Sequence, residues 1–271
     1  MATYVFSDVH GHFGALDRLL ERVSPTSDDR IFMLGDMIDR GPDPISVVRF
    51  CHDLPNCTVL MGNHEDLMLS YYADPDDPSA AINWEINGAY PTQDGFRALP
   101  VEERVELARW LFTLPLYAQA EVAGRHYLLV HAGIDPSRLD LSSIDDVGSI
   151  DEETLDGLLG NQYRDDLMWI RDDFWGYPTG LVNDRGEGII TIAGHTPTPY
   201  LSFMADRPDR SPTNEKGLGR MVRVGACEAT GGVADRWDID CGCAGGAGYG
   251  QLLMLRLDDQ EEFYEPVREG E

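Results

Sequence analysis

Polar side chains that could bind a metal ion follow several of the apolar runs in this chain. The clearest example is the pair Asn63 and His64, which comes after the apolar run 57–60 and the glycine at position 62. A short apolar run is typical of a buried strand, and a glycine after it permits a tight turn. Helix-favouring residues follow at 65–70, so we expect Asn63 and His64 to be exposed at a strand-to-helix junction. Open α/β sheets bind their ligands at such carboxyl ends of strands, which makes this junction a candidate site.

Four other apolar runs end in similar residues. They are followed by Asp8 with His10, by Asp36, by His131 and by His195. Any one of these could be an ordinary polar turn residue, and Asn63 could simply cap a helix. Five of the seven histidines fall at strand ends, however, namely His10, His12, His64, His131 and His195, and that grouping favours a shared site.

The chemistry of these side chains narrows the choice of ligand. Carboxylates, imidazoles and an amide oxygen together suit Mn²⁺, Fe or Zn²⁺, whereas an all-oxygen set would indicate Mg²⁺ or Ca²⁺. Six ligands are too many for one tetrahedral zinc ion. They fit two ions that share a bridging carboxylate, an arrangement used for metal-assisted hydrolysis.

The first part of the chain alternates between strand and helix patterns. Apolar runs at 2–6, 31–34 and 57–60 predict strands, and helical spacing of apolar residues at 13–23 and within 42–53 predicts helices between them. This β-α-β-α-β order predicts parallel strands joined by right-handed crossovers. Residues 72–100 break the rhythm, and we interpret them as an insertion lying over the site.

The second part of the chain lacks this rhythm. A helix is predicted at 101–114. Strands are predicted after it, at 116–122, 126–130, 189–193, 221–224, 237–239 and 250–257. This pattern predicts a second sheet packed against the first, within a single domain that covers residues 1–271.

Composition limits the possible partners and surroundings. The formal net charge of −27 makes duplex nucleic acid and anionic membranes poor partners. No apolar run approaches 18 residues and no secretion signal is visible, so we expect a cytoplasmic protein.

The five cysteines lack CxxC spacing and are expected to be reduced thiols. Cys241 and Cys243 could line the site or oxidise together, although two small buried residues at a strand end is the simpler interpretation. Nothing in the sequence indicates an oligomeric state.

Five short motifs occur between residues 8 and 195: Asp8-Val9-His10-Gly11, Gly35-Asp36-Met37-Ile38-Asp39-Arg40-Gly41, Gly62-Asn63-His64-Glu65, His131-Ala132-Gly133 and Gly194-His195. Together, and in this order, they resemble the calcineurin-like metallophosphoesterase superfamily. The Asp-Arg-Gly at 39–41 and the glutamate after His64 are similar to its phosphoprotein phosphatase branch, and small bacterial serine/threonine phosphatases look most alike. The resemblance implies an α/β fold, a four-layer α-β-β-α sandwich of two packed mixed sheets.

The resemblance also implies two bound divalent ions, most simply Mn²⁺, with Fe or Zn²⁺ as alternatives. The implied ligands are Asp8 and His10 for the first ion, Asp36 as the bridge, and Asn63, His131 and His195 for the second ion. A hydroxide between the two ions would then attack phosphorus in line with the leaving oxygen.

Four further residues have implied catalytic or binding roles. His64, oriented by Asp39, would protonate the leaving oxygen, and Arg40 and Arg171 would bind the phosphoryl oxygens. Each has an ordinary alternative. Arg40 could pair with Asp39 or Asp43, Arg171 could pair with the two aspartates that follow it, and Asp39 could only cap a turn.

Three functions follow as hypotheses. The first is hydrolysis of phosphomonoesters, with phosphoserine, phosphothreonine or phosphotyrosine in proteins as the expected substrate class. The second is hydrolysis of dinucleoside polyphosphates, for which Trp84, Tyr90 and Arg97 could bind the nucleotide. The third is a metal-binding interaction module without catalysis, and it is disfavoured because no metal-ligand position is lost.

Overall fold

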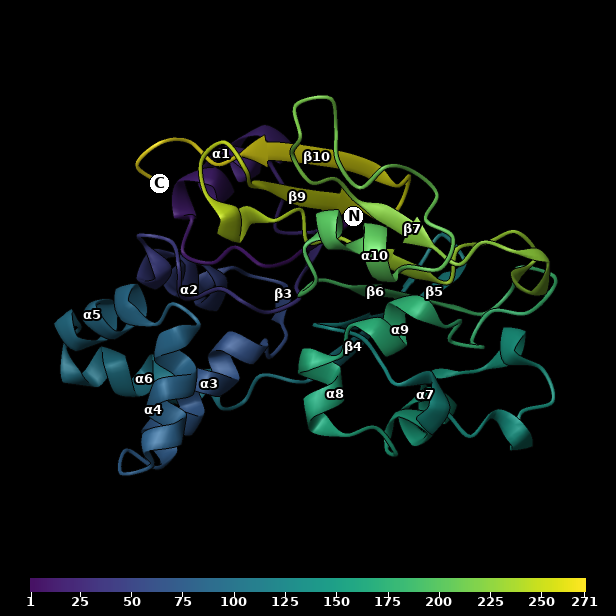
Figure 1. Cartoon of the computed structure of the whole chain (residues 1–271), viewed down its shortest axis with the longest axis horizontal. Coiled ribbons are helices and arrows are strands. Elements are labelled where there is room, and N and C mark those ends of the chain that lie inside the picture. Colours follow the sequence, from purple (N-terminus) through teal and green to yellow (C-terminus); the bar gives the residue numbers. More distant parts are fainter.

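The computed structural model describes residues 1–271 and contains two five-stranded sheets (Figure 1). The first sheet has the order β10-β9-β1-β2-β3. Its strands are β1 (Thr3–Phe6), β2 (Arg30–Met33), β3 (Cys57–Val59), β9 (Gln251–Arg256) and β10 (Glu261–Pro266). β1, β2 and β3 run parallel to one another, which confirms the prediction from the first part of the chain. β9 and β10 add antiparallel strands at the other edge.

The second sheet has the order β4-β5-β6-β8-β7. Its strands are β4 (Tyr117–Val122), β5 (Arg125–Val130), β6 (Ile189–Ala193), β7 (Val222–Val224) and β8 (Arg236–Asp238). β4 and β5, which correspond to the strands predicted at 116–122 and 126–130, form an antiparallel hairpin. β5, β6 and β8 run parallel, although their connections do not follow the simple βαβ rhythm of the first sheet. Each sheet therefore contains three adjacent parallel strands, which lie at one edge of the first sheet and in the middle of the second.

Side chains that alternate along the strands hold the layers together. Val5 of β1 and Leu129 of β5 point into the core between the sheets, whereas their neighbours Phe6 and Leu128 face the helices outside. This period of two is what a sheet buried on both faces requires. The result is a four-layer α-β-β-α sandwich, as predicted.

Ten helices cover the sheets. They are α1 (Phe13–Val23), α2 (Pro44–Asp53), α3 (Asn63–Ala73), α4 (Pro78–Ile86), α5 (Tyr90–Ala98), α6 (Val101–Leu111), α7 (Glu152–Leu159), α8 (Arg164–Trp169), α9 (Asp172–Gly176) and α10 (Leu201–Met204). Short 3-10 turns are η1 (Pro136–Arg138), η2 (Leu141–Ser143), η3 (Val147–Ser149), η4 (Thr198–Tyr200), η5 (Glu228–Thr230) and η6 (Cys243–Gly245). In Figure 1, α3 to α6 gather on one side of the molecule and α7 to α9 on the other. None of these helices has both the length and the apolar character needed to cross a membrane.

A fully buried arginine fixes one of these helices beside the second sheet. Arg236 of β8 donates from one nitrogen to the carbonyls of Phe174 and Trp175 in α9, at 2.9 and 2.8 Å, and pairs with Asp235. A buried guanidinium needs such partners because the loss of hydration is otherwise large. These bonds hold α9 to the sheet, and with it Arg171, which directly precedes the helix.

The structure differs from the expectations in three places. The segment expected to break the rhythm contains two helices, α4 and α5. The helix predicted at 101–114 ends at Leu111. β10 has no counterpart among the predicted strands, because its glutamates at 261, 262 and 265 hide the apolar signal of an edge strand.

Candidate metal centre

The parallel strands of both sheets bring their carboxyl ends together at one edge of the sandwich. Five predicted ligands follow five of these strands, within four residues of each strand end: Asp8 after β1, Asp36 after β2, Asn63 after β3, His131 after β5 and His195 after β6. All five are buried. Strands far apart in the sequence thus contribute to a single site.

The expectation that Asn63 and His64 are exposed is wrong. Their exposed fractions are 2% and 1%. His131 of the second sheet lies 2.9 Å from the amide oxygen of Asn63, and Arg40 lies 3.0 Å from Nε2 of His64. These long-range neighbours cover the junction.

The backbone of the site is held in an unusual conformation. Asp8, His10, Asp36 and His195 have φ angles of 53°, 47°, 61° and 65°, in the left-handed region. This conformation is uncommon for residues other than glycine and costs on the order of 1–3 kcal/mol each. Hydrogen bonds compensate, such as that from the His10 N–H to the Asp36 carbonyl at 3.0 Å. Because of this backbone conformation, side chains that ordinary turns would direct apart point toward one another.

Close backbone contact explains the glycine at position 62. A Cβ atom there would overlap the backbone nitrogen and the carboxylate of Asp36. The turns after β2 and β3 can approach only if this residue is glycine.

One group of ligand atoms consists of His10, Asp36 and His64. Nε2 of His10 lies 3.4 Å from Oδ2 of Asp36, and Nε2 of His64 lies 4.0 Å from the same oxygen. Nδ1 of His10 donates to the Ile38 carbonyl at 2.9 Å, so Nε2 carries the lone pair. A histidine oriented in this way is ready to act as a metal ligand.

A second group consists of Asp36, His131 and His195, with Asn63 between them. The Asn63 amide oxygen lies 2.9 Å from Nε2 of His131 and 2.9 Å from Nδ1 of His195. His131 donates from Nδ1 to the Leu34 carbonyl at 2.8 Å, so its Nε2 lone pair faces two acceptors, the Asn63 oxygen and Oδ1 of Asp36 at 3.5 Å. Acceptor atoms that converge in this way could together bind a cation.

The protonation states agree with this interpretation. Burial lowers the pKa of His131 to about 3 and lowers the pKa of His10 and His195 well below the ordinary histidine value. These imidazoles are therefore neutral near pH 7, as metal ligands must be. Burial raises the pKa of Asp36 well above its usual range, and the neighbouring Asp8 carboxylate adds to this rise. A cation would relieve this crowding of carboxylates. The two oxygens of Asp36 face the two groups, as a bridging ligand would.

Asp8 is placed differently from the other predicted ligands and belongs to neither group of ligand atoms. Its carboxylate accepts the His195 backbone N–H, at 3.1 and 3.0 Å, and the Ser7 hydroxyl. Asp8 thus fixes the turn that carries His195.

His64 and Asp39 form a buried pair, with Nδ1 of His64 2.6 Å from Oδ2 of Asp39. Two side chains from the segment 72–100 hold this carboxylate. Trp84 of α4 donates its indole N–H at 2.9 Å, and Thr92 of α5 donates its hydroxyl at 2.6 Å. The segment therefore contacts the site from behind Asp39. Its description as an insertion stays a prediction.

The two predicted phosphate-binding arginines have no carboxylate within ion-pair distance. Arg40 instead points at His10 and His64, at 3.4 and 3.0 Å, and Arg171 contacts the Thr196 hydroxyl at 3.4 Å. The alternative pairings with neighbouring aspartates are therefore not formed. Both guanidiniums remain available to an anion in the cleft.

Asp240 is a residue that the prediction did not include. It lies two residues after β8, so the third parallel strand of the second sheet also ends in a buried carboxylate. Burial raises its pKa to about 6, and the positive charges of Arg40 and Arg171 oppose this rise. The apolar residues before Asp240 were a sequence signal for this position.

Glu65, the glutamate that follows His64, supports the site from beneath the turn that carries Asp36. It is fully buried, and its carboxylate accepts the backbone N–H groups of Asp36, Met37 and Gly62 at 2.9, 2.8 and 3.0 Å. Burial raises its pKa to about 7. Glu65 thereby fixes the turn that presents Asp36 to both groups of ligand atoms.

We expect Glu65→Ala to lower the free energy of unfolding by about 2–5 kcal/mol, because three buried N–H donors would lose their acceptor. Urea unfolding at pH 8 of chelator-treated protein measures this, since the carboxylate is then mostly ionised. Glu106→Ala, an exposed change on α6, is the matched control and should stay within about 0.5 kcal/mol of the parent. Equal stability of the two variants would contradict the role given to Glu65.

The site opens into a cleft of about 560 Å³. Trp169, Tyr200 and Tyr249 line it together with Arg40 and Arg171. The residues expected to bind a nucleotide do not: Trp84 is buried against Asp39, and Tyr90 and Arg97 lie outside the cleft. Cys241 and Cys243 are buried, free thiols that do not line it, in agreement with their simpler interpretation.

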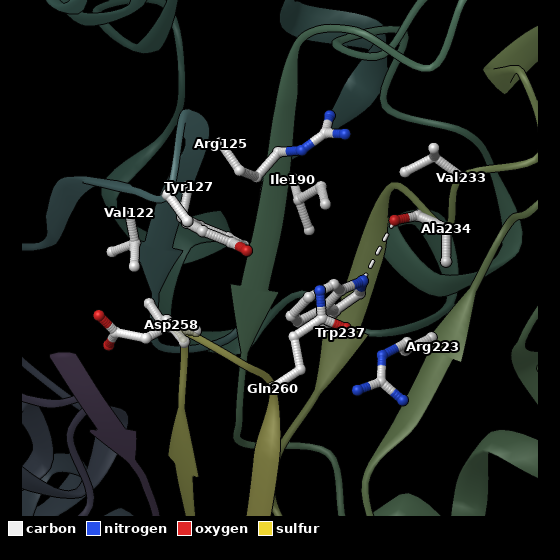
Figure 2. Close-up of a pocket in the computed structure, with 12 residues that line it drawn as sticks. Val122, Arg125, Tyr127, Ile190, Arg223, Val233, Ala234, Trp237, Asp258 and Gln260 are labelled. Atoms are coloured by element: carbon white, nitrogen blue, oxygen red, sulfur yellow. Dashed lines mark hydrogen bonds between the residues drawn. The ribbon is translucent and has the colours of Figure 1, made fainter. Parts of the chain in front are cut away.

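A different cavity, of about 380 Å³, lies at the opposite ends of the strands (Figure 2). Tyr127, Ile190 and Trp237 form its wall, and the Trp237 indole donates to the Ala234 carbonyl at 3.2 Å. No histidine lines this cavity, and neither group of metal-ligand side chains reaches it. The side chains that could hold a metal therefore lie at the carboxyl ends of the strands, away from this cavity.

Fold and site together place the protein among the metal-dependent phosphoesterases. Residues 1–221 match the family described as calcineurin-like phosphoesterases, and the chain belongs to this family, as its motifs predicted. A relative from Erwinia tasmaniensis, named a symmetrical bis(5'-nucleosyl)-tetraphosphatase, is 33% identical, covering 99% of this chain and 98% of its own. A relative of the same name from Vibrio parahaemolyticus is 26% identical, with 97% and 98% covered. A crystal structure described as a putative diadenosine tetraphosphatase has a TM-score of 0.58 at 18% identity, covering 99% and 94%, and supports the fold.

Proposed function

We propose that this protein hydrolyses dinucleoside tetraphosphates at the central P–O–P linkage and releases two nucleoside diphosphates. The observation that carries the proposal is a cleft in which two unpaired arginines and aromatic side chains surround the metal-ligand groups. The full-length similarity to relatives named symmetrical tetraphosphatases supports it. The second hypothesis from the sequence is therefore favoured over the first, which expected phosphorylated proteins as substrates.

We assign a separate role to each residue of the site. Arg40 and Arg171 would bind the non-bridging oxygens of the central phosphates through charge-assisted hydrogen bonds. His64 would donate a proton to the leaving phosphate oxygen, and Asp39 would hold the imidazole in position. Two divalent ions, most simply Mn²⁺, would polarise the phosphoryl group and acidify a water for in-line attack.

The test compares substrates by kcat/KM after chelator treatment and addition of Mn²⁺. Diadenosine tetraphosphate, a phosphopeptide and p-nitrophenyl phosphate are the three substrates. We expect a preference of at least about 10²-fold for the dinucleotide, with ADP as the only nucleotide product, because only that substrate offers both a polyphosphate for the arginines and bases for the aromatic side chains of the cleft. Preference for the phosphopeptide would restore the first hypothesis. No turnover of any substrate with any metal would favour the interaction module.

A further inference from the structure

The cleft carries more exposed aromatic surface than its metal-ligand groups require. Tyr200 and Tyr249 are 56% and 78% exposed, although both line the cleft. Neither hydroxyl forms a hydrogen bond within the protein. Large aromatic side chains that stay exposed around a cleft mark a binding surface for an apolar or π-bonded group.

Both tyrosines lie only a few residues along the chain from polar residues of the site. Tyr200 ends η4, five residues after His195. Tyr249 lies in the loop after η6, nine residues after Asp240. Trp169, the last residue of α8, stands edge-on to the His195 ring at 5.8 Å. The aromatic wall is therefore built from the second half of the chain and adjoins the arginines.

We propose that Tyr200 and Tyr249 form a stacking surface for the purine base of the substrate and thereby select nucleoside polyphosphates over proteins phosphorylated on serine or threonine. This inference rests on the proposed function. A base has a π face that stacks on aromatic side chains, whereas phosphoserine and phosphothreonine side chains have none. The arginines bind phosphate in either substrate, so the tyrosines supply the discrimination.

The test measures binding of ADP and of pyrophosphate to the Mn²⁺-loaded protein by titration calorimetry. Tyr200→Ala/Tyr249→Ala should weaken ADP binding roughly 10- to 100-fold and leave pyrophosphate binding unchanged. Tyr249→Phe keeps the ring and should bind ADP like the parent. Tyr90→Ala is the control, because Tyr90 is equally exposed but lies outside the cleft, and it should change neither affinity.

The outcomes separate this inference from the proposed function. Unchanged ADP affinity in the double variant, or an equal loss for both ligands, would overturn the stacking surface while turnover of diadenosine tetraphosphate by the parent still supported the function. Failure of the parent to cleave the dinucleotide would refute the function, and the selection assigned to the two tyrosines would fall with it.

Discussion

Replacing His131 by alanine should abolish metal-dependent hydrolysis. Its Nε2 atom lies 2.9 Å from the Asn63 oxygen and 3.5 Å from Asp36, at the centre of the second ligand group. Loss of this imidazole removes a ligand that is already neutral and oriented, so one ion should be lost from each chain. Metal-ion polarisation supplies several kcal/mol of transition-state stabilisation, which corresponds to a loss of about 10³-fold or more in turnover.

Metal content by mass spectrometry, measured together with turnover, checks this prediction. The matched control is His126→Ala, which lies on the same strand but has an exposed side chain, and it should keep both metal and activity. Circular dichroism would show that both variants are folded. If His131→Ala kept its full metal content and turnover, the assignment of the second ligand group would be wrong.

The convergence of the candidate ligands could be predicted because it follows a local rule. Each candidate lies within four residues of the end of a strand, and parallel strands place such positions at one edge of the sheet. Asp240 obeys the same rule but was overlooked. The end of β8 meets the ends of the other parallel strands because β8 pairs parallel to β6. That pairing joins segments separated by more than forty residues, so it was not visible in the sequence.

The supporting contacts could not be predicted, because they depend on long-range packing. Trp84 looked like a surface for a nucleotide, yet its indole N–H is used inside the protein to hold Asp39. The left-handed backbone at Asp8 and Asp36 contradicts local preference and persists only because neighbouring turns enforce it. The sequence pattern therefore predicted which side chains converge but not the contacts that orient them.

The second large effect concerns the proton donor. His64→Ala should lower kcat by about 10²–10⁴-fold, because a positioned acid contributes on this scale. Metal content should be kept although His64 belongs to the first group of ligand atoms, because its Nε2 lies 4.0 Å from Asp36, farther than that of His10 at 3.4 Å. The loss should be larger for phenyl phosphate than for p-nitrophenyl phosphate, since p-nitrophenolate leaves readily without a proton. His52→Ala, on the outer helix α2, is the control and should change neither rate.

A double-mutant cycle tests whether Asp39 acts through His64. Oδ2 of Asp39 accepts from Nδ1 of His64 at 2.6 Å, so Asp39→Asn should lower kcat, but it should have little further effect in the His64→Ala background. Independent, additive losses would show that Asp39 has a separate role, for example in placing Arg40. An equal loss for both aryl phosphates in His64→Ala would mean that His64 does not donate the proton. The geometry favours the coupled result, because Trp84 and Thr92 fix Asp39 in the one position from which it can orient the imidazole.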